Sequence, residues 1–157
     1  MSHWINYLLT SMSAFLAMEC IAWFAHKYIM HGFLWSLHHD HHQRDDRGFF
    51  EKNDYFFLIF GLPGISLIGW GTFHGFGYDF WTGVGISLYG FAYFFVHDIF
   101  IHQRFKIFRN SNSVYLRAIR RAHKMHHKHL GKEHGECFGM LWVPLHYFLD
   151  ELKRKAS

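Results

Sequence analysis

Cysteine is scarce in this chain, with two residues among 157. Cys20 lies in an apolar stretch and Cys137 in a polar segment far along the chain, so a disulfide framework is not indicated. Two thiols are also too few to hold an iron–sulfur cluster. The first residues lack the basic start and small-residue cleavage site of a signal peptide, and we expect the first apolar stretch to be kept as a membrane anchor.

Acidic residues are missing from the segment between Gln103 and Lys132, which carries nine Lys or Arg. In a soluble protein such a segment suggests nucleic-acid binding. The sequence has neither a nucleic-acid-binding motif nor a Gly-rich phosphate loop, so we expect no nucleic-acid partner. We interpret the segment as the cytoplasmic flank of a membrane protein, where it would contact lipid headgroups or dock an acidic electron donor.

Apolar residues make up 50% of the chain and aromatics 21%, and they lie in long blocks. Residues 5–24, 55–73 and 82–101 are each long and apolar enough to span a bilayer. A fourth apolar run, residues 138–149, is short and contains Pro144 and His146, which favours an interfacial or re-entrant segment. The predicted fold class is an all-α integral membrane helical bundle, with residues 1–157 forming a single domain.

The distribution of Lys and Arg predicts the orientation of the three spans. The segment before the first span and the loop 74–81 have none, whereas the loop 32–54 contains Arg44, Arg47 and Lys52. The positive-inside rule then places the N-terminus outside and the C-terminal third in the cytoplasm.

Ten of the 16 histidines form a repeated spacing pattern in four short runs. Two runs have the form His-x4-His and two contain His-x2-His-His, in an order that repeats once. All four runs fall on the predicted cytoplasmic side, whereas His3 and His74 fall on the opposite side. The ten are His26, His31, His38, His41, His42, His97, His102, His123, His126 and His127.

Helical geometry treats the two spacings differently. Positions i, i+3 and i+4 share a helix face, so His-x2-His-His residues should converge. Residues five apart lie about 140° apart on an ideal helix. We therefore predict an irregular turn, such as a π-bulge, within His26–His31 and His97–His102.

Ten imidazoles are too many for one metal ion and suit two, which we expect to lie in two half-sites. Imidazole binds Fe, Cu, Zn or Ni, and the ligands alone do not choose among these metals. For His39, His129, His134 and His146 we expect ordinary interfacial hydrogen bonding. Carboxylates near the runs could orient the ligands; Glu19, inside the first span, and Asp98 are the main candidates, and the others are Asp40, Asp45, Asp46 and Asp54.

The motifs resemble those of the membrane fatty-acid hydroxylase and sterol-desaturase superfamily, and within it the bacterial β-carotene hydroxylases. The resemblance extends from the first span to about Trp142. It rests on Met18-Glu19, Ala25-His26-Lys27-Tyr28-Ile29-Met30-His31-Gly32, Asn53-Asp54, His97-Asp98, His102-Gln103-Arg104, Ala122-His123, Met125-His126-His127, Gly131-Lys132-Glu133 and Phe138-Gly139. Many relatives in the wider superfamily have His-x3-His where this chain has His-x4-His.

The resemblance implies a non-haem di-iron monooxygenase of carotenoid biosynthesis, with the ten histidines as iron ligands and O2 as cosubstrate. It would convert β-carotene to β-cryptoxanthin and zeaxanthin, or canthaxanthin to astaxanthin. Ferredoxin and ferredoxin reductase would supply electrons, and zinc could replace iron in purified samples. The enzyme would lie in the bacterial inner membrane with its active site on the cytoplasmic side. Possible liners of a substrate slot are Tyr89, Tyr93, Phe94, Phe95 and Phe100.

Two alternative functions are also compatible with the sequence. A carotenoid ketolase, or a sterol or fatty-acid hydroxylase or desaturase, would use a similar site. A His-rich membrane metal transporter belongs to another class, and it predicts ligands near the bilayer midplane with a route to both faces. The histidines of this chain gather on one face instead.

Overall fold

Helices make up the secondary structure of residues 3–43, 48–107 and 110–156, which the computed structural model describes, and these residues form no strand. The predicted all-α class is confirmed for this part of the chain. In order, the helices are α1 (His3–Phe24), the π-helix η1 (Ala25–Phe33), α2 (Trp35–His42), α3 (Asp54–Phe73), α4 (Tyr78–Phe94), the π-helix η2 (Phe95–Ile101), α5 (Val114–His126) and α6 (Leu145–Ala156).

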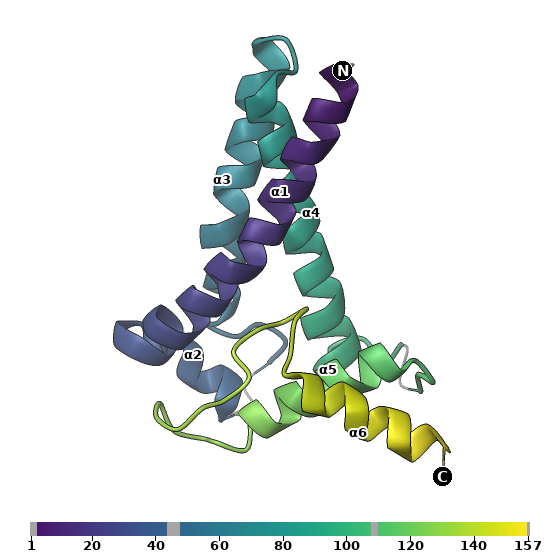
Figure 1. The fold of residues 1–157 in the computed structure, drawn as a ribbon. Coiled ribbons are helices and arrows are strands. Elements are labelled where there is room, and N and C mark those ends of the chain that lie inside the picture. The colour runs from purple at the N-terminus through teal and green to yellow at the C-terminus, as the bar shows by residue number, and fades with distance from the viewer. Residues whose placement is uncertain (1–2, 44–47, 108–109, 157) are drawn as a thin grey trace.

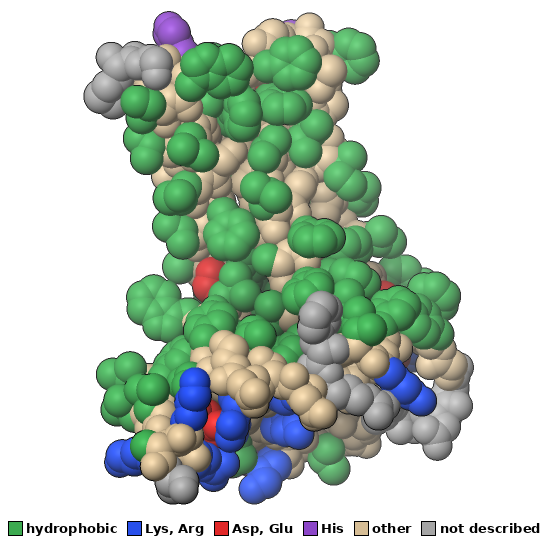
Figure 2. Space-filling model, turned by 90° about the vertical axis from the view of Figure 1, so that its right-hand side faces the viewer, with side chains coloured by type: hydrophobic (Ala, Val, Ile, Leu, Met, Phe, Trp, Pro, Cys, Tyr) green, Lys and Arg blue, Asp and Glu red, His purple; other side chains and the backbone are tan. Residues whose placement is uncertain are grey.

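Three helical segments are long and apolar enough to cross a membrane: His3–Phe33, Asp54–Phe73 and Tyr78–Ile101. They rise side by side from a base that contains α2, α5 and α6 (Figure 1). Large apolar side chains project outward from them, with Leu8 61% and Leu62 57% exposed. Exposed apolar side chains cover the shaft of the molecule and Lys and Arg gather at its base (Figure 2), a distribution that suits a bilayer around the shaft.

Small residues let the three spans approach closely. An added Cβ on Gly85 of α4 would collide with the backbone oxygen of Ser11 on α1, and one on Gly64 of α3 would lie 2.8 Å from the hydroxyl of Ser87 on α4. Between helices in lipid, close packing of this kind is a main source of association. α4 therefore contacts both α1 and α3.

The base has its own apolar core, formed where α5 and α6 pack near η2. Phe100 of η2, Ile119 and Ala122 of α5 and Tyr147 of α6 are all buried in it. The hydroxyl of Ser113 accepts the N–H of Leu116 and caps α5. This core fixes the end of α5 that carries the last histidine run.

The fourth apolar run does not form a span. Residues 135–144 are not helical, and α6 begins only at Leu145, directly after Pro144. The non-helical stretch reaches up toward the lower parts of α1 and α4 (Figure 1). The run is thus a loop at the foot of the spans followed by a base helix, in keeping with the predicted interfacial or re-entrant segment.

Candidate metal centre

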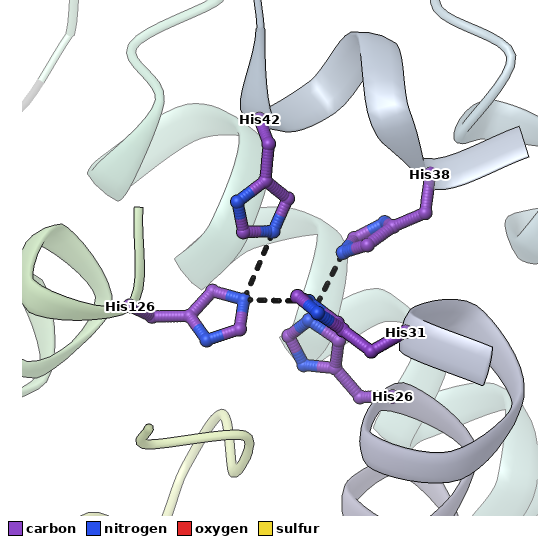
Figure 3. Close-up of side chains that lie close together, drawn as sticks. All are labelled: His26, His31, His38, His42 and His126. Atoms are coloured by element: carbon purple, nitrogen blue, oxygen red, sulfur yellow. Dashed lines mark hydrogen bonds between the residues drawn. The ribbon is translucent and has the colours of Figure 1, made fainter. Parts of the chain in front are cut away.

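Five buried histidines form a first cluster at the foot of the spans. Their ring nitrogens available as ligands all lie within 4.8 Å of one another. The side chains converge from three separate segments (Figure 3). η1 contributes His26 and His31, α2 contributes His38 and His42, and α5 contributes His126.

A second cluster lies beside the first. Its ligand nitrogens, from His41, His97, His102 and His123, also lie within 4.8 Å of one another. The Nε2 atom of His127 is 2.9 Å from that of His123 and adds a fifth imidazole. The structure therefore brings all ten predicted residues together in two groups, and their role as metal ligands stays a prediction.

The expected convergence of each His-x2-His-His run on one cluster is wrong, because each run is divided between the two clusters. His41 belongs to the second cluster although its run mates His38 and His42 lie in the first, and His126 lies in the first although its neighbours join the second. Adjacent helical residues point about 100° apart. α2 and the end of α5 each supply both clusters because they run between the two.

Both predicted irregular turns are confirmed. His26 and His31 both lie in η1, and His97 lies in η2, with His102 directly after its end. The N–H of His102 donates to the carbonyl of His97 at 2.8 Å, an i→i+5 bond that joins the pair itself. A turn with this hydrogen bond places residues five apart on one face, so both members can reach the same cluster.

Seven of the ten rings have their Nδ1 atom within 2.7–3.2 Å of an oxygen that can only accept a hydrogen bond. Nδ1 must therefore carry the proton, and Nε2 keeps its lone pair. The acceptors are the carbonyls of Phe138, Lys132, His129 and Glu136, the amide oxygen of Asn53, and the carboxylates of Glu51 and Asp98.

The Nε2 atoms of these rings face one another at 3.0–3.2 Å, in the pairs His26–His38, His31–His126, His42–His126 and His41–His97. Three of these contacts are drawn as dashed lines in Figure 3. Two lone pairs at this distance repel unless a cation lies between them. Ligand nitrogens about 2.1 Å from one ion lie about 3 Å apart when their bonds meet near 90°. The donor set therefore fits a metal ion in each cluster.

Burial keeps the imidazoles neutral. It lowers the pKa of His42 to about 4, with a further lowering from His31, and that of His126 to about 3, with a further lowering from His42. The pKa values of His38, His41 and His123 lie well below the ordinary value for the same reason. Neutral imidazole is the form that binds metals.

Two carboxylates contact the second cluster. Asp98, a predicted candidate, accepts the Nδ1–H of His97 at 3.2 Å. Glu51, which the sequence analysis missed, accepts that of His41 at 2.8 Å. Arg104 bridges the two, with nitrogens 3.0 Å from Asp98 and 3.1 Å from Glu51.

The other predicted carboxylates are placed elsewhere. Asp54 pairs with Arg104 at 2.7 Å and accepts the backbone N–H of Glu51 at 3.0 Å. Asp40 accepts the backbone N–H of Lys52 at 2.7 Å. Asp45 and Asp46 lie outside the described residues.

Glu19 contacts the fourth apolar run. Its Oε1 atom accepts the backbone N–H groups of Met140, Leu141 and Trp142 at 2.9, 3.0 and 2.9 Å, and its Oε2 atom accepts the hydroxyl of Tyr89 at 2.7 Å. The same segment supplies the Phe138 carbonyl to His26. Glu19 therefore reaches the centre through the loop it holds.

The remaining histidines take no part in the clusters. His39, His134 and His146 are exposed, and His129 offers its carbonyl to His42. His3 and His74 lie at the far ends of α1 and α3.

An apolar cavity of about 230 Å³ lies between the three spans and reaches both clusters through His26 and His97. Of the five aromatics predicted to line it, Tyr89, Tyr93 and Phe94 do so. Phe95 is not among the lining residues, and Phe100 is instead buried in the base core. Eight aromatic residues line the cavity: Phe56, Phe57, Phe60, Tyr89, Phe91, Tyr93, Phe94 and Phe138.

Comparison with known protein families shows the family to which this chain belongs. The fatty acid hydroxylase family model matches residues 11–149, which is most of the chain. The chain belongs to the fatty acid hydroxylase family. No solved structure matches it at a significant level.

Proteins similar to this chain come from bacteria and plants. The chain is 40% identical over 141 residues to the beta-carotene hydroxylase of Pantoea ananas. The aligned region covers 90% of this chain and 79% of that protein. It is 39% identical over 139 residues to the enzyme of the same name from Pseudescherichia vulneris, covering 88% and 77%. It is 40% identical over 154 residues to the chloroplastic beta-carotene hydroxylase 2 of Capsicum annuum, covering 94% of this chain and 49% of that protein.

Proposed function

We propose that this chain is a carotenoid 3-hydroxylase, an O2-dependent di-iron monooxygenase acting on β-ionone rings. One observation carries the proposal: two buried histidine clusters meet an apolar, aromatic-lined cavity between helices that can span a membrane. The similarity to proteins named beta-carotene hydroxylase supports the choice of substrate. We expect β-carotene to give β-cryptoxanthin and then zeaxanthin, and canthaxanthin to give astaxanthin.

The ten clustered histidines would hold two iron ions, five in each cluster. Bound iron would supply the activation of O2 for insertion of one oxygen atom into a ring C–H bond. The overall reaction consumes one O2, two electrons and two protons, and releases the hydroxylated ring and one water. Zinc also suits imidazole and could occupy the same positions after purification.

The protein holds the imidazoles in place and shapes the space next to them. The Nδ1–H bonds fix the ring orientations, so that the Nε2 atoms converge without rearrangement. The cavity wall also touches the centre, since the Phe138 ring lies 5.4 Å from that of His26 and the Tyr93 ring lies 5.0 Å from that of His97. A β-ionone ring at this end would lie beside both clusters, shielded from water.

The residues that line the cavity are spread along the spans. They extend from Asn53, which precedes α3, to Ile65, about 18 Å at 1.5 Å per residue. A rod-shaped polyene fits such a slot, entering sideways from the bilayer with its ring toward the histidines. The eight aromatic liners suit the planar polyene and the ring of a carotenoid.

Orientation and electron supply follow from the charge distribution. From the positive-inside rule we infer that the Lys- and Arg-rich base, and with it both clusters, faces the cytoplasm at a bacterial inner membrane. Reduced ferredoxin, regenerated by ferredoxin reductase, is the donor we infer, because an acidic carrier would be attracted to the Lys and Arg of the base. The same cations suit lipid headgroups.

Expression in a bacterial host that accumulates β-carotene tests the function. We expect hydroxylated carotenoids on pigment analysis with the wild-type chain and none with His38→Ala. Formation of ketolated pigment in place of hydroxylated pigment, or unchanged β-carotene while a sterol or fatty acid is converted, would contradict the proposal. Uptake of metal into vesicles without any turnover would favour transport.

A further inference from the structure

The two clusters differ in the charge of the groups that accept the Nδ1–H of their imidazoles. In the second cluster, His41 and His97 donate their Nδ1–H to carboxylates, those of Glu51 and Asp98. In the first cluster every Nδ1 faces an uncharged oxygen: the carbonyls of Phe138, Lys132, His129 and Glu136 and the amide of Asn53.

Arg104 holds the carboxylates of Glu51 and Asp98 in place beside the second cluster. The Arg104 side chain, only 9% exposed, lies within 3.1 Å of Glu51, Asp54 and Asp98. Three carboxylates face this one guanidinium, so the group stays net negative. Arg104 orients the carboxylates without cancelling the charge behind His41 and His97.

We propose that the two metal positions are inequivalent, and that the carboxylate-backed second cluster binds a divalent cation more tightly and fills first. A carboxylate that accepts the Nδ1–H makes the imidazole a more basic ligand, and its charge attracts the cation. The number of ligands does not separate the positions, since each cluster offers five imidazoles. The inference rests on the proposed dimetal centre and adds an order of loading to it.

Anaerobic titration of the metal-free protein in detergent with ⁵⁷Fe(II), followed by Mössbauer spectroscopy, tests the order. In the wild type we expect one quadrupole doublet up to one equivalent and a second doublet only after that. Glu51→Gln keeps an oxygen facing His41 but removes the charge. It should weaken the first-filled position by about 10–100-fold, so that one equivalent distributes over both doublets. Asp98→Asn should do the same if Glu51→Gln fails to fold.

The converse variant is Asn53→Asp, because Asn53 accepts the Nδ1–H of His38 at 2.7 Å. A carboxylate there should tighten the first cluster, and the two doublets should then grow together. Lys52→Gln is the matched control, since it removes an exposed charge next to Glu51 and should leave the wild-type order intact.

The possible results separate the two proposals. Two equivalents that enter the wild type together would overturn the inequivalence. An order unchanged in Glu51→Gln, Asp98→Asn and Asn53→Asp would overturn its assignment to the carboxylates. Either result would leave the dimetal centre in place. A wild-type protein that binds no iron would overturn the proposed function and the order of loading together.

Discussion

The hydroxyl of Tyr89 donates a 2.7 Å hydrogen bond to the carboxylate of Glu19, joining α4 to α1 within the spans. The other carboxylate oxygen accepts three consecutive backbone N–H groups, those of residues 140–142. The loop held in this way carries the Phe138 carbonyl that orients His26. One acidic side chain therefore links two spans, a loop and the candidate metal centre.

Glu19→Ala should release this loop. Three backbone N–H groups would lose their acceptor, at a cost of about 1–3 kcal/mol for each that stays buried. We expect a lower melting temperature in detergent and faster proteolysis within residues 131–144. Tyr89→Phe should show a weaker form of both effects, and Cys20→Ala, an exposed change one residue along α1, should show neither. A Glu19→Ala protein as stable as Cys20→Ala would contradict the proposed role of Glu19 in holding the loop.

The adjacent residues His38 and His39 offer a matched test of the ligand assignment. His38 is 1% exposed and lies in the first cluster, whereas His39 is exposed. His38→Ala should lower iron affinity by about 100-fold or more, since losing even an outer partner of a ligand costs about 10–100-fold. Iron per chain, measured by plasma emission spectroscopy, should stay at the wild-type value in His39→Ala. Equal losses in both variants would count against the assignment.

Substitutions at two glycines of α3 separate the role of the cavity in turnover from the role of helix packing in stability. Gly61 lines the cavity, and an added Cβ there meets nothing within 4 Å. Gly61→Leu should fill the slot and reduce turnover by about 10²-fold through misplaced substrate, with iron content unchanged. Gly64→Ala would instead press on Ser87 and Ile86, at 2.8 and 2.9 Å, and should destabilise the protein by about 1–3 kcal/mol. Pigment assays and thermal melts separate the two effects, and wild-type turnover in Gly61→Leu would exclude this slot as the substrate site.

Acid should destabilise the metal-free protein. Folding lowers the pKa of His42 from 6.5 to about 4 and that of His126 from 6.5 to about 3. The unfolded chain therefore binds more protons than the folded chain below pH 6.5, and the free energy of unfolding falls as the pH drops from there toward 4 and 3. Thermal melts in detergent at pH 7.5 and 5.5 should show a lower midpoint at pH 5.5. A midpoint that rises on acidification would contradict the neutral, buried state of these rings.

The spans and the ten clustered histidines were predictable because both signals are local. Hydropathy over about twenty residues marks a span, and the spacing of the pairs required the wide turns that η1 and η2 provide. The division of each run between the two clusters was not predictable. The cluster that His41 or His126 joins depends on how α2 and α5 lie in the folded protein.

The hydrogen-bond partners of the imidazoles could not be predicted from the sequence either. The Lys132 and Phe138 carbonyls reach His31 and His26 across 101 and 112 positions, and a carbonyl has no residue-type signal. Asp54, near a histidine run in sequence, pairs with Arg104 instead.

The i→i+5 bond between His97 and His102 has an evolutionary consequence. A π turn contains one residue more than the α-helical turn that it replaces. A relative with three residues between its paired histidines can place them on one face of an ordinary helix. Alignments of the two branches should therefore open a one-residue gap inside each histidine pair, because a gap outside would equate ligands with non-ligands.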